Sequence, residues 1–198
     1  MSLTLSPPVR SSYALLQDHW NKCTRCPLHE SRRRVVHARG TLPCTVLFIG
    51  EAPGESEDSL GKPFIGPAGK LFDEIIAEVV TNLGKPFTYA LVNLVGCWPK
   101  VEVELSSGET RQPTKDEIQK CQPHLIELIR LARPKLIVTL GDLARRNLPR
   151  NTGINNKIRE ASLIHPANIL HRDNPSAQEL DFKRSVLTLT QHIRALES

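Results

Sequence analysis

The sequence predicts an α/β fold in which a parallel sheet is covered by helices on both faces. Short apolar runs at 45–49, 89–95 and 134–140 have the length of strands, and their unbroken apolar character is typical of strands buried on both sides. Segments with helical periodicity or helix-start signals lie between these runs. Strands that alternate with helices along a chain are typical of parallel sheets.

Length and composition agree with one domain that spans residues 1–198. The chain is 39% hydrophobic and 24% charged, which is ordinary for a globular protein with a proper core. No apolar stretch approaches the ~20 residues of a membrane span, and the N-terminus lacks the features of a secretory signal. We therefore expect no membrane partner and a cytoplasmic location associated with the nucleoid.

Charge adds a weaker indication about the partner. The net charge is +5 and the pI about 9.1, and arginines cluster at Arg32, Arg33 and Arg34. A basic balance of this kind favours a polyanionic partner, although such runs are also common on solvated faces.

The elements can be placed in order along the chain. Residues 9–22 read as a helix with Tyr13, Leu16 and Trp20 on one face, and with the following Cys-x2-Cys they form an N-terminal segment, 9–30, expected to pack on the domain. After a basic loop or short strand at 31–43 we expect a strand at 45–49, a loop at 50–69, a helix at 70–80, a strand at 89–95, an irregular stretch at 97–113, a helix at 115–132 begun by a Thr114/Glu117 capping box, a strand at 134–140, a short helix at 142–148, a turn at 151–156, a strand at 161–164 and a last helix at 176–196.

The loop at 50–69 is a candidate functional site by its position. It follows the first core strand, and ligands of open α/β sheets bind at the carboxyl ends of strands. It contains five glycines, several carboxylates and one aromatic residue, Phe64. Loops this long in compact domains are usually functional or disordered. A nucleotide-binding loop is excluded because neither glycine-rich phosphate motif is present.

Five cysteines raise the question of a metal centre. Cys23 and Cys26 form a Cys-x2-Cys pair, Cys97 follows the second strand, and Cys121 lies early in the next helix. Four thiolates could hold either zinc or an iron–sulfur cluster, and the spacing does not decide between them. The alternative is that Cys97 and Cys121 are ordinary buried thiols. Cys44 reads as a core residue.

Several motifs in fixed order give the chain a family resemblance. They are Cys23-x2-Cys26, Gly50-Glu51-Ala52-Pro53-Gly54 with Glu57-Asp58, Gly61-x-Pro63-Phe64-Ile65-Gly66-x-Ala68-Gly69-x-Leu71, the strand that carries Asn93, and His165-Pro166-Ala167. With them the chain resembles the iron–sulfur uracil-DNA glycosylases of family 4. The resemblance implies a three-layer α/β/α sandwich with a central four-stranded parallel sheet. It also implies a [4Fe–4S] cluster on Cys23, Cys26, Cys97 and Cys121 that holds loops in place.

The same resemblance implies roles for the residues of a base pocket. A glycosylase must extrude its nucleotide from the duplex. Phe64 would stack on the extruded base, and the Asn93 amide would read the edge of uracil and oppose cytosine. His165 would hydrogen-bond uracil O2 as negative charge develops there. Glu51 would orient the attacking water and stabilise the sugar cation, and the backbone at Ala52 and Pro53 would line the pocket.

Further residues are assigned to DNA contact and to support. Ile169 and Leu170 would form an apolar wedge that fills the gap left by the base, or would simply pack the last helix. Arg172 would meet phosphates. Glu57 and Asp58 are expected to support the loop or the edge of the pocket. The acidic insertion at 101–108 contains no histidine, so we do not expect a covalent intermediate on histidine.

The function implied is monofunctional, hydrolytic release of uracil from single- or double-stranded DNA by a monomer. Two alternatives stay open. One is a non-catalytic iron–sulfur module that binds DNA, and the other is a related glycosylase that acts on a different deaminated base.

Overall fold

The central sheet of the computed structural model has six strands in the order β1-β2-β4-β3-β7-β8, and the structure describes residues 2–101, 109–153 and 158–197. The strands are β1 (Thr4–Leu5), β2 (Arg39–Leu42), β3 (Val46–Gly50), β4 (Tyr89–Asn93), β7 (Leu136–Leu140) and β8 (Arg159–Leu163), and a separate hairpin pairs β5 (Lys100–Val101) with β6 (Glu109–Thr110). Strands β4, β3, β7 and β8 are mutually parallel, which confirms the expected four-stranded parallel sheet. β2 extends it antiparallel to β4, and β1 runs parallel to β2.

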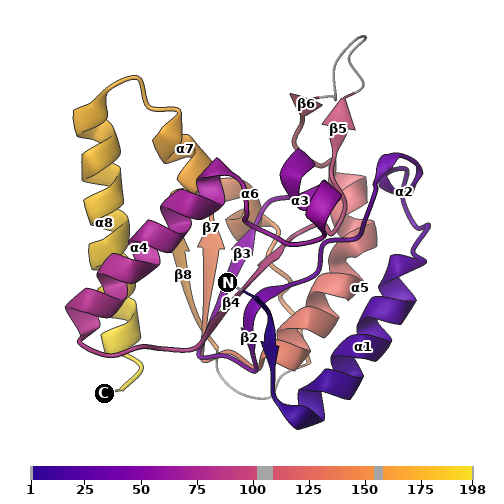
Figure 1. Ribbon diagram of the computed structural model, residues 1–198, viewed down its shortest axis with the longest axis horizontal. Helices are drawn as coiled ribbons and strands as arrows, with labels where there is room; N and C mark the ends of the chain where they lie inside the picture. The colour runs from indigo at the N-terminus through magenta and orange to yellow at the C-terminus, as the bar shows by residue number, and fades with distance from the viewer. Residues whose placement is uncertain (1, 102–108, 154–157, 198) are drawn as a thin grey trace.

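Helices cover both faces of this sheet. They are α1 (Pro7–Asn21), α2 (Leu28–Ser31), α3 (Glu55–Leu60), α4 (Pro67–Leu83), α5 (Lys115–Ala132), α6 (Asp142–Arg146), α7 (Pro166–Leu170) and α8 (Pro175–Arg194). Helices α4 and α8 lie on one side of the sheet and α1 and α5 on the other, so the three-layer α/β/α arrangement is confirmed (Figure 1). None of the helices within the described residues is both long and apolar enough to cross a membrane.

The hydrophobic core is divided by the sheet into two halves. Along β3, Leu47 and Ile49 face the cluster under α1 and α5, whereas Phe48 faces the cluster under α4 and α8. This alternation is the two-residue period of a strand, and each of these side chains is fully buried. Burial of one such side chain stabilises the fold by about 1.5–3 kcal/mol, so both helical layers are held firmly to the sheet.

Helix ends follow the chemistry of their capping residues. The Thr114 side chain accepts a hydrogen bond from the Glu117 amide at 3.2 Å, and the Glu117 carboxylate accepts one from the Thr114 amide at 2.7 Å. This is the capping box expected at the start of α5. Glu117 also pairs with Arg111 at 2.7 Å, which ties the start of α5 to the segment after β6.

Two segments differ from the sequence-based expectation, and two others complete the comparison. The loop at 50–69 contains a helix, α3, which begins after Gly54 and ends at Gly61 in the left-handed region with φ 69°. The residues after His165 form helix α7, whereas Arg39–Leu42 form the short strand that was one of the two forms expected within 31–43. The paired strands β5 and β6 flank the expected insertion at 101–108, whose residues 102–108 lie outside the described part of the chain. Residues 154–156 of the expected turn also lie outside it.

Candidate active site

The segment between β3 and α4 is closed by one carboxylate. Glu57, on α3, accepts hydrogen bonds from the backbone amides of Gly54 at 3.1 Å and of Ile65 and Gly66 at 2.9 Å each. A carboxylate that accepts three backbone N–H groups holds their relative positions firmly. Glu57 therefore fixes the start of α3 to the start of α4, and this confirms its expected role as a support of the loop.

The neighbouring carboxylate supports a different segment. Asp58 is 1% exposed and accepts the backbone amide of Arg33 on both oxygens at 3.0 Å and that of Arg34 at 3.4 Å. It thereby attaches the chain after α2 to α3. The expectation that Asp58 supports the loop is confirmed, and the contact extends that role to the arginine segment.

Phe64 is held against the end of β3 in an unusual backbone conformation. Its φ is 56°, a left-handed value that a bulky residue rarely adopts, and it is 7% exposed. A Cβ added to Gly69 would come within 2.0 Å of the Phe64 carbonyl oxygen, and one added to Gly50 within 2.4 Å of the Phe64 ring. Both glycines are therefore needed for the ring to lie where it does.

Asn93 lies beside the same ring and carries an unpartnered acceptor. It ends β4 in register with Gly50, and a Cβ on Gly50 would come within 2.6 Å of Asn93 Oδ1. Asn93 is 5% exposed, and its Oδ1 is one of two buried side-chain polar atoms without a hydrogen-bond partner within the described residues. A buried acceptor left unsatisfied costs about 1–3 kcal/mol. Such an atom indicates that a donor from a ligand belongs there.

His165 completes one side of this cluster. Its ring centroid lies 6.3 Å from that of Phe64, with 32° between the ring planes. Its Nδ1 accepts a hydrogen bond from the Ala167 amide at 3.2 Å, and burial lowers the pKa of the imidazole to about 4. The ring is therefore neutral at pH 7 with its proton on Nε2. A neutral Nε2–H group can donate to a ligand oxygen.

Glu51 follows Gly50 directly at the carboxyl end of β3. It is half-buried, and burial raises the pKa of its carboxyl group. Ala52 is half-buried and Pro53 is buried in the same turn. The backbone of the turn stays attached to the residues after Asn93, because Leu94 donates to the Gly50 carbonyl at 3.0 Å and Val95 to the Glu51 carbonyl at 3.4 Å. The carboxylate and the amide thus emerge from adjoining strand ends.

The expected DNA-contact residues are not all at the surface. Ile169 is 2% exposed and belongs to the core cluster under α4 and α8, so its expected place in an exposed wedge does not agree with the structure. It faces inward because residues after His165 form a helix rather than a loop. Leu170 is 40% exposed. Arg172 pairs with Asp181 at 3.0 Å and keeps about half of its side chain exposed.

The four expected metal-ligand cysteines line one small cavity. Cys23, Cys26, Cys97 and Cys121 surround a space of about 20 Å³ together with apolar neighbours such as Leu28 and Val95. Burial raises the pKa of Cys97 to about 11 and that of Cys121 to about 12, and neighbouring thiolates add to both shifts. Among the described side chains, no three of the Cys, His, Asp or Glu type are placed to hold a metal ion.

Two hydrogen-bond donors approach these sulfurs, and the fifth cysteine lies apart. The Gly96 amide lies 3.3 Å from Cys121 Sγ, and an Arg32 guanidinium nitrogen lies 3.7 Å from Cys97 Sγ. Cys44 is 6% exposed within the core, where burial raises its pKa to about 12, as expected for a core thiol.

Sequence reasoning missed the supporting residues of the site. Gly50 and Gly69 were read only as parts of motifs, although their close approach to Phe64 places its ring. The five glycines of the loop could have indicated this, because a ring or backbone segment that packs very close to the chain requires a residue without a Cβ at that position. The contact of Arg32 with Cys97 joins residues 65 positions apart and has no signal in the sequence.

Comparison with known proteins gives one family for most of the chain. The model of the uracil DNA glycosylase superfamily matches residues 38–189. Curated relatives include a type-4 uracil-DNA glycosylase of Archaeoglobus fulgidus, which is 31% identical over 181 residues, covering 82% of this chain and 85% of the relative. Another, from Saccharolobus solfataricus, is 40% identical over 127 residues, covering 64% of this chain.

The lengths covered differ among these relatives. The aligned region spans about half (54%) of the Saccharolobus protein and 59% of a type-4 uracil-DNA glycosylase of Pyrobaculum aerophilum. Among solved structures, that of SMUG2 from Pedobacter heparinus has a TM-score of 0.58 at 13% identity, covering 78% of this chain and 76% of that chain. This last likeness concerns the fold alone.

Proposed function

Because the chain belongs to the uracil DNA glycosylase superfamily, we propose that it removes uracil from DNA by hydrolysing the N-glycosidic bond. The observation that carries this proposal is the buried, unpartnered Oδ1 of Asn93 beside the ring of Phe64. A buried acceptor beside an aromatic ring suits the N3–H of uracil, and the amide NH₂ suits its O4. Cytosine presents the reverse pattern and would leave both groups unpaired.

The remaining residues of the site match the steps of a hydrolysis. Phe64 would stack on the extruded base, and the neutral His165 would donate from Nε2 to uracil O2. The C1′–N1 bond breaks and its electron pair leaves with the base, where negative charge spreads to O2. Glu51, as a carboxylate, would stabilise the cationic sugar and orient the water whose oxygen bonds to C1′. The proton of that water passes to Glu51 or to solvent.

On the DNA side, Leu170 is the apolar residue available to fill the gap left by the base, since it is 40% exposed. Arg172 keeps its expected role at a phosphate. Ala52 and Pro53 would line the pocket through their backbone. We expect the protein to act as a single-domain monomer on single- or double-stranded DNA, in the cytoplasm with the nucleoid, where such a substrate is found.

We also propose that the four cysteines hold a [4Fe–4S] cluster. The donor set fits, because four thiols surround one small cavity and two N–H groups reach their sulfurs, while Arg25, Arg32 and Lys120 also line the cavity. A single zinc ion, which bonds each sulfur at about 2.3 Å, is the alternative occupant of the same four thiols. A bound cluster would cross-link the N-terminal segment, the turn after β4 and α5.

A base-release assay tests the function. Purified, cluster-loaded protein should release uracil from single- and double-stranded oligonucleotides, whereas Glu51→Ala should lose most of this activity and still bind the DNA. Tight binding without base release would identify a DNA-binding module instead, and release of another deaminated base in preference to uracil would correct the substrate. A brown protein with absorbance near 400 nm would support the cluster, and a colourless zinc protein would refute it.

A further inference from the structure

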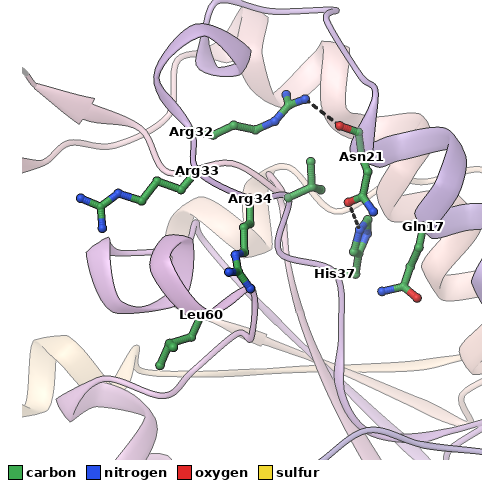
Figure 2. A pocket seen from close by; sticks show the side chains of 9 residues that line it. Gln17, Asn21, Arg32, Arg33, Arg34, His37 and Leu60 are labelled. Carbon is green, nitrogen blue, oxygen red and sulfur yellow. Dashed lines mark hydrogen bonds between the residues drawn. The ribbon is translucent and has the colours of Figure 1, made fainter.

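A cleft apart from the cluster of Phe64, Asn93 and His165 lies between the end of α1, the chain after α2 and the end of α3. It has a volume of about 350 Å³ and contains three consecutive arginines, Arg32, Arg33 and Arg34. Figure 2 shows these side chains with Asn21 and Gln17 of α1 on one side and Leu60 of α3 on the other. No carboxylate is among the residues that line it.

The three arginines are not equally free. Arg32 donates to the Asn21 carbonyl oxygen at 3.0 Å and approaches Cys97 Sγ, and Arg33 donates to Ser59 Oγ at 2.8 Å and points away from the cleft (Figure 2). The guanidinium group of Arg34 has neither an ion pair nor a hydrogen bond within residues 2–101, 109–153 and 158–197. Arg34 is therefore the cation available to a ligand.

The position of Arg34 is built into the fold. Its backbone amide is bound by the buried Asp58, and its Cδ lies over Gly61, where an added Cβ would come within 3.3 Å. Gly61 also has the left-handed φ that ends α3. A side chain whose backbone and stem are both held loses less freedom on binding than one on a loose loop.

A chain of buried histidines presents a second donor to the cleft. His37 and His124 share a hydrogen bond of 2.9 Å, and His37 Nε2 lies 3.0 Å from Asn21 Oδ1. Burial lowers both pKa values, to about 4 and about 3, so each ring carries one proton. Because Asn21 Oδ1 can only accept, His37 donates from Nε2 and His124 donates to His37 Nδ1. The Asn21 NH₂ group is thereby left to donate to a ligand.

The cleft adjoins the base pocket across one short helix. Leu60 and Gly61 at the end of α3 line the cleft, whereas Glu57 on the same helix holds the turn that carries Phe64. A helix is about 10–12 Å wide, so a DNA strand whose extruded base lies against Phe64 can reach the cleft within a few nucleotides.

We propose that this arginine cleft binds a backbone phosphate of the DNA, within a few nucleotides of the extruded base, through Arg34 and the Asn21 amide. A free guanidinium group and an amide donor match the acceptor-only oxygens of a phosphodiester. The position in nucleotides rests on the proposed function, whereas the phosphate chemistry rests on the cleft itself.

Binding measured as a function of salt tests the proposal. Fluorescently labelled duplexes with and without uracil would be titrated with the wild-type protein, Arg34→Gln and the matched control Arg133→Gln, whose exposed arginine lies between α5 and the start of β7. Arg34→Gln should weaken both duplexes equally, by about 10-fold, and reduce the slope of log Kobs against log salt by about 0.9. Arg133→Gln should change neither. Equal slopes for all three proteins would overturn the proposal.

Neutral methylphosphonate linkages locate the contact. Placed one at a time on either side of uracil, one linkage should weaken wild-type binding and have no further effect in Arg34→Gln. If no position couples to Arg34, while inorganic phosphate raises the melting temperature of the wild type but not of Arg34→Gln, the cleft binds a free anion and the DNA assignment is wrong. Because these measurements need no base release, failure of catalysis alone would leave the cleft intact as a finding, and normal catalysis with unchanged slopes would refute only the cleft.

Discussion

Replacement of Asn93 by leucine should make the free protein more stable while it destroys uracil recognition. Leucine has the same branched heavy-atom skeleton as asparagine, with two methyl groups in place of the amide oxygen and nitrogen, and carries no polar atoms in its side chain. In the wild type the Asn93 Oδ1 atom is buried without a partner in the described part of the chain. Its removal therefore takes away an unfavourable contribution to the free energy of folding.

The expected magnitudes follow from this geometry. An unsatisfied buried acceptor costs about 1–3 kcal/mol, and for a chain of this length each kcal/mol corresponds to about 2–4 °C in melting temperature. Asn93→Leu should thus melt about 2–12 °C higher than the wild type. Loss of a two-bond contact to a base edge costs about 1–3 kcal/mol, so uracil release should fall about 5- to 150-fold.

Thermal melting and single-turnover base release measure the two effects on the same preparations. Thr139→Val is the matched control, because Thr139 is 2% exposed on β7, two strands from β4 in the same sheet, but its hydroxyl donates to the Ala161 carbonyl. That variant should lose about 0.5–1.5 kcal/mol of stability and keep its activity. If Asn93→Leu melts below the wild type by as much as the control does, the unpartnered acceptor does not have the cost assigned to it.

Three further predictions concern other parts of the molecule. The rate of uracil release should fall as pH is lowered through the raised pKa of Glu51, because the carboxylate is the working form, and Glu51→Gln should show a flat, low profile over the same range. The free energy of unfolding should fall as pH drops from about 6.5 towards 4, because histidines of the unfolded chain bind protons in this range while His37 and His124 stay neutral in the folded protein. Measured by chemical denaturation, His124→Gln should reduce the slope of this free energy against pH by about 1.4 kcal/mol per pH unit. Gly69→Ala should impair both folding and activity by several kcal/mol, because its Cβ would lie 2.0 Å from a backbone oxygen, whereas Gly84→Ala, which meets no neighbour within 4 Å, should show only the strain of its positive φ.

Much of the fold could be predicted because its strands are simple apolar runs. The strands expected at 45–49 and 89–95 correspond to Val46–Gly50 and Tyr89–Asn93. The capping box of α5 was visible in the sequence because both of its residues act locally. Helix α3 was not, since six residues rich in carboxylates and bounded by glycines have no apolar face, and their helix is stabilised by contacts of Glu57 and Asp58 to distant backbone amides.

The residues of the candidate site could likewise be predicted only in part. Phe64, Asn93 and His165 were named from motifs, and the structure brings them together, whereas the exposure expected of Ile169 was wrong because α7 turns it into the core. The missing partner of Asn93 Oδ1 depends on which atoms surround it in three dimensions. No local pattern in the sequence carries that information.

The six residues of α3 also restrict how this part of the chain can change over evolution. Successive residues of a helix point about 100° apart, so Glu57 and Asp58 reach two different neighbours only because they are adjacent. One residue inserted or deleted between Gly54 and Glu57 would rotate both carboxylates away from their targets at once. Point substitutions on the outer side of this helix should therefore be tolerated far more readily than any change in its length.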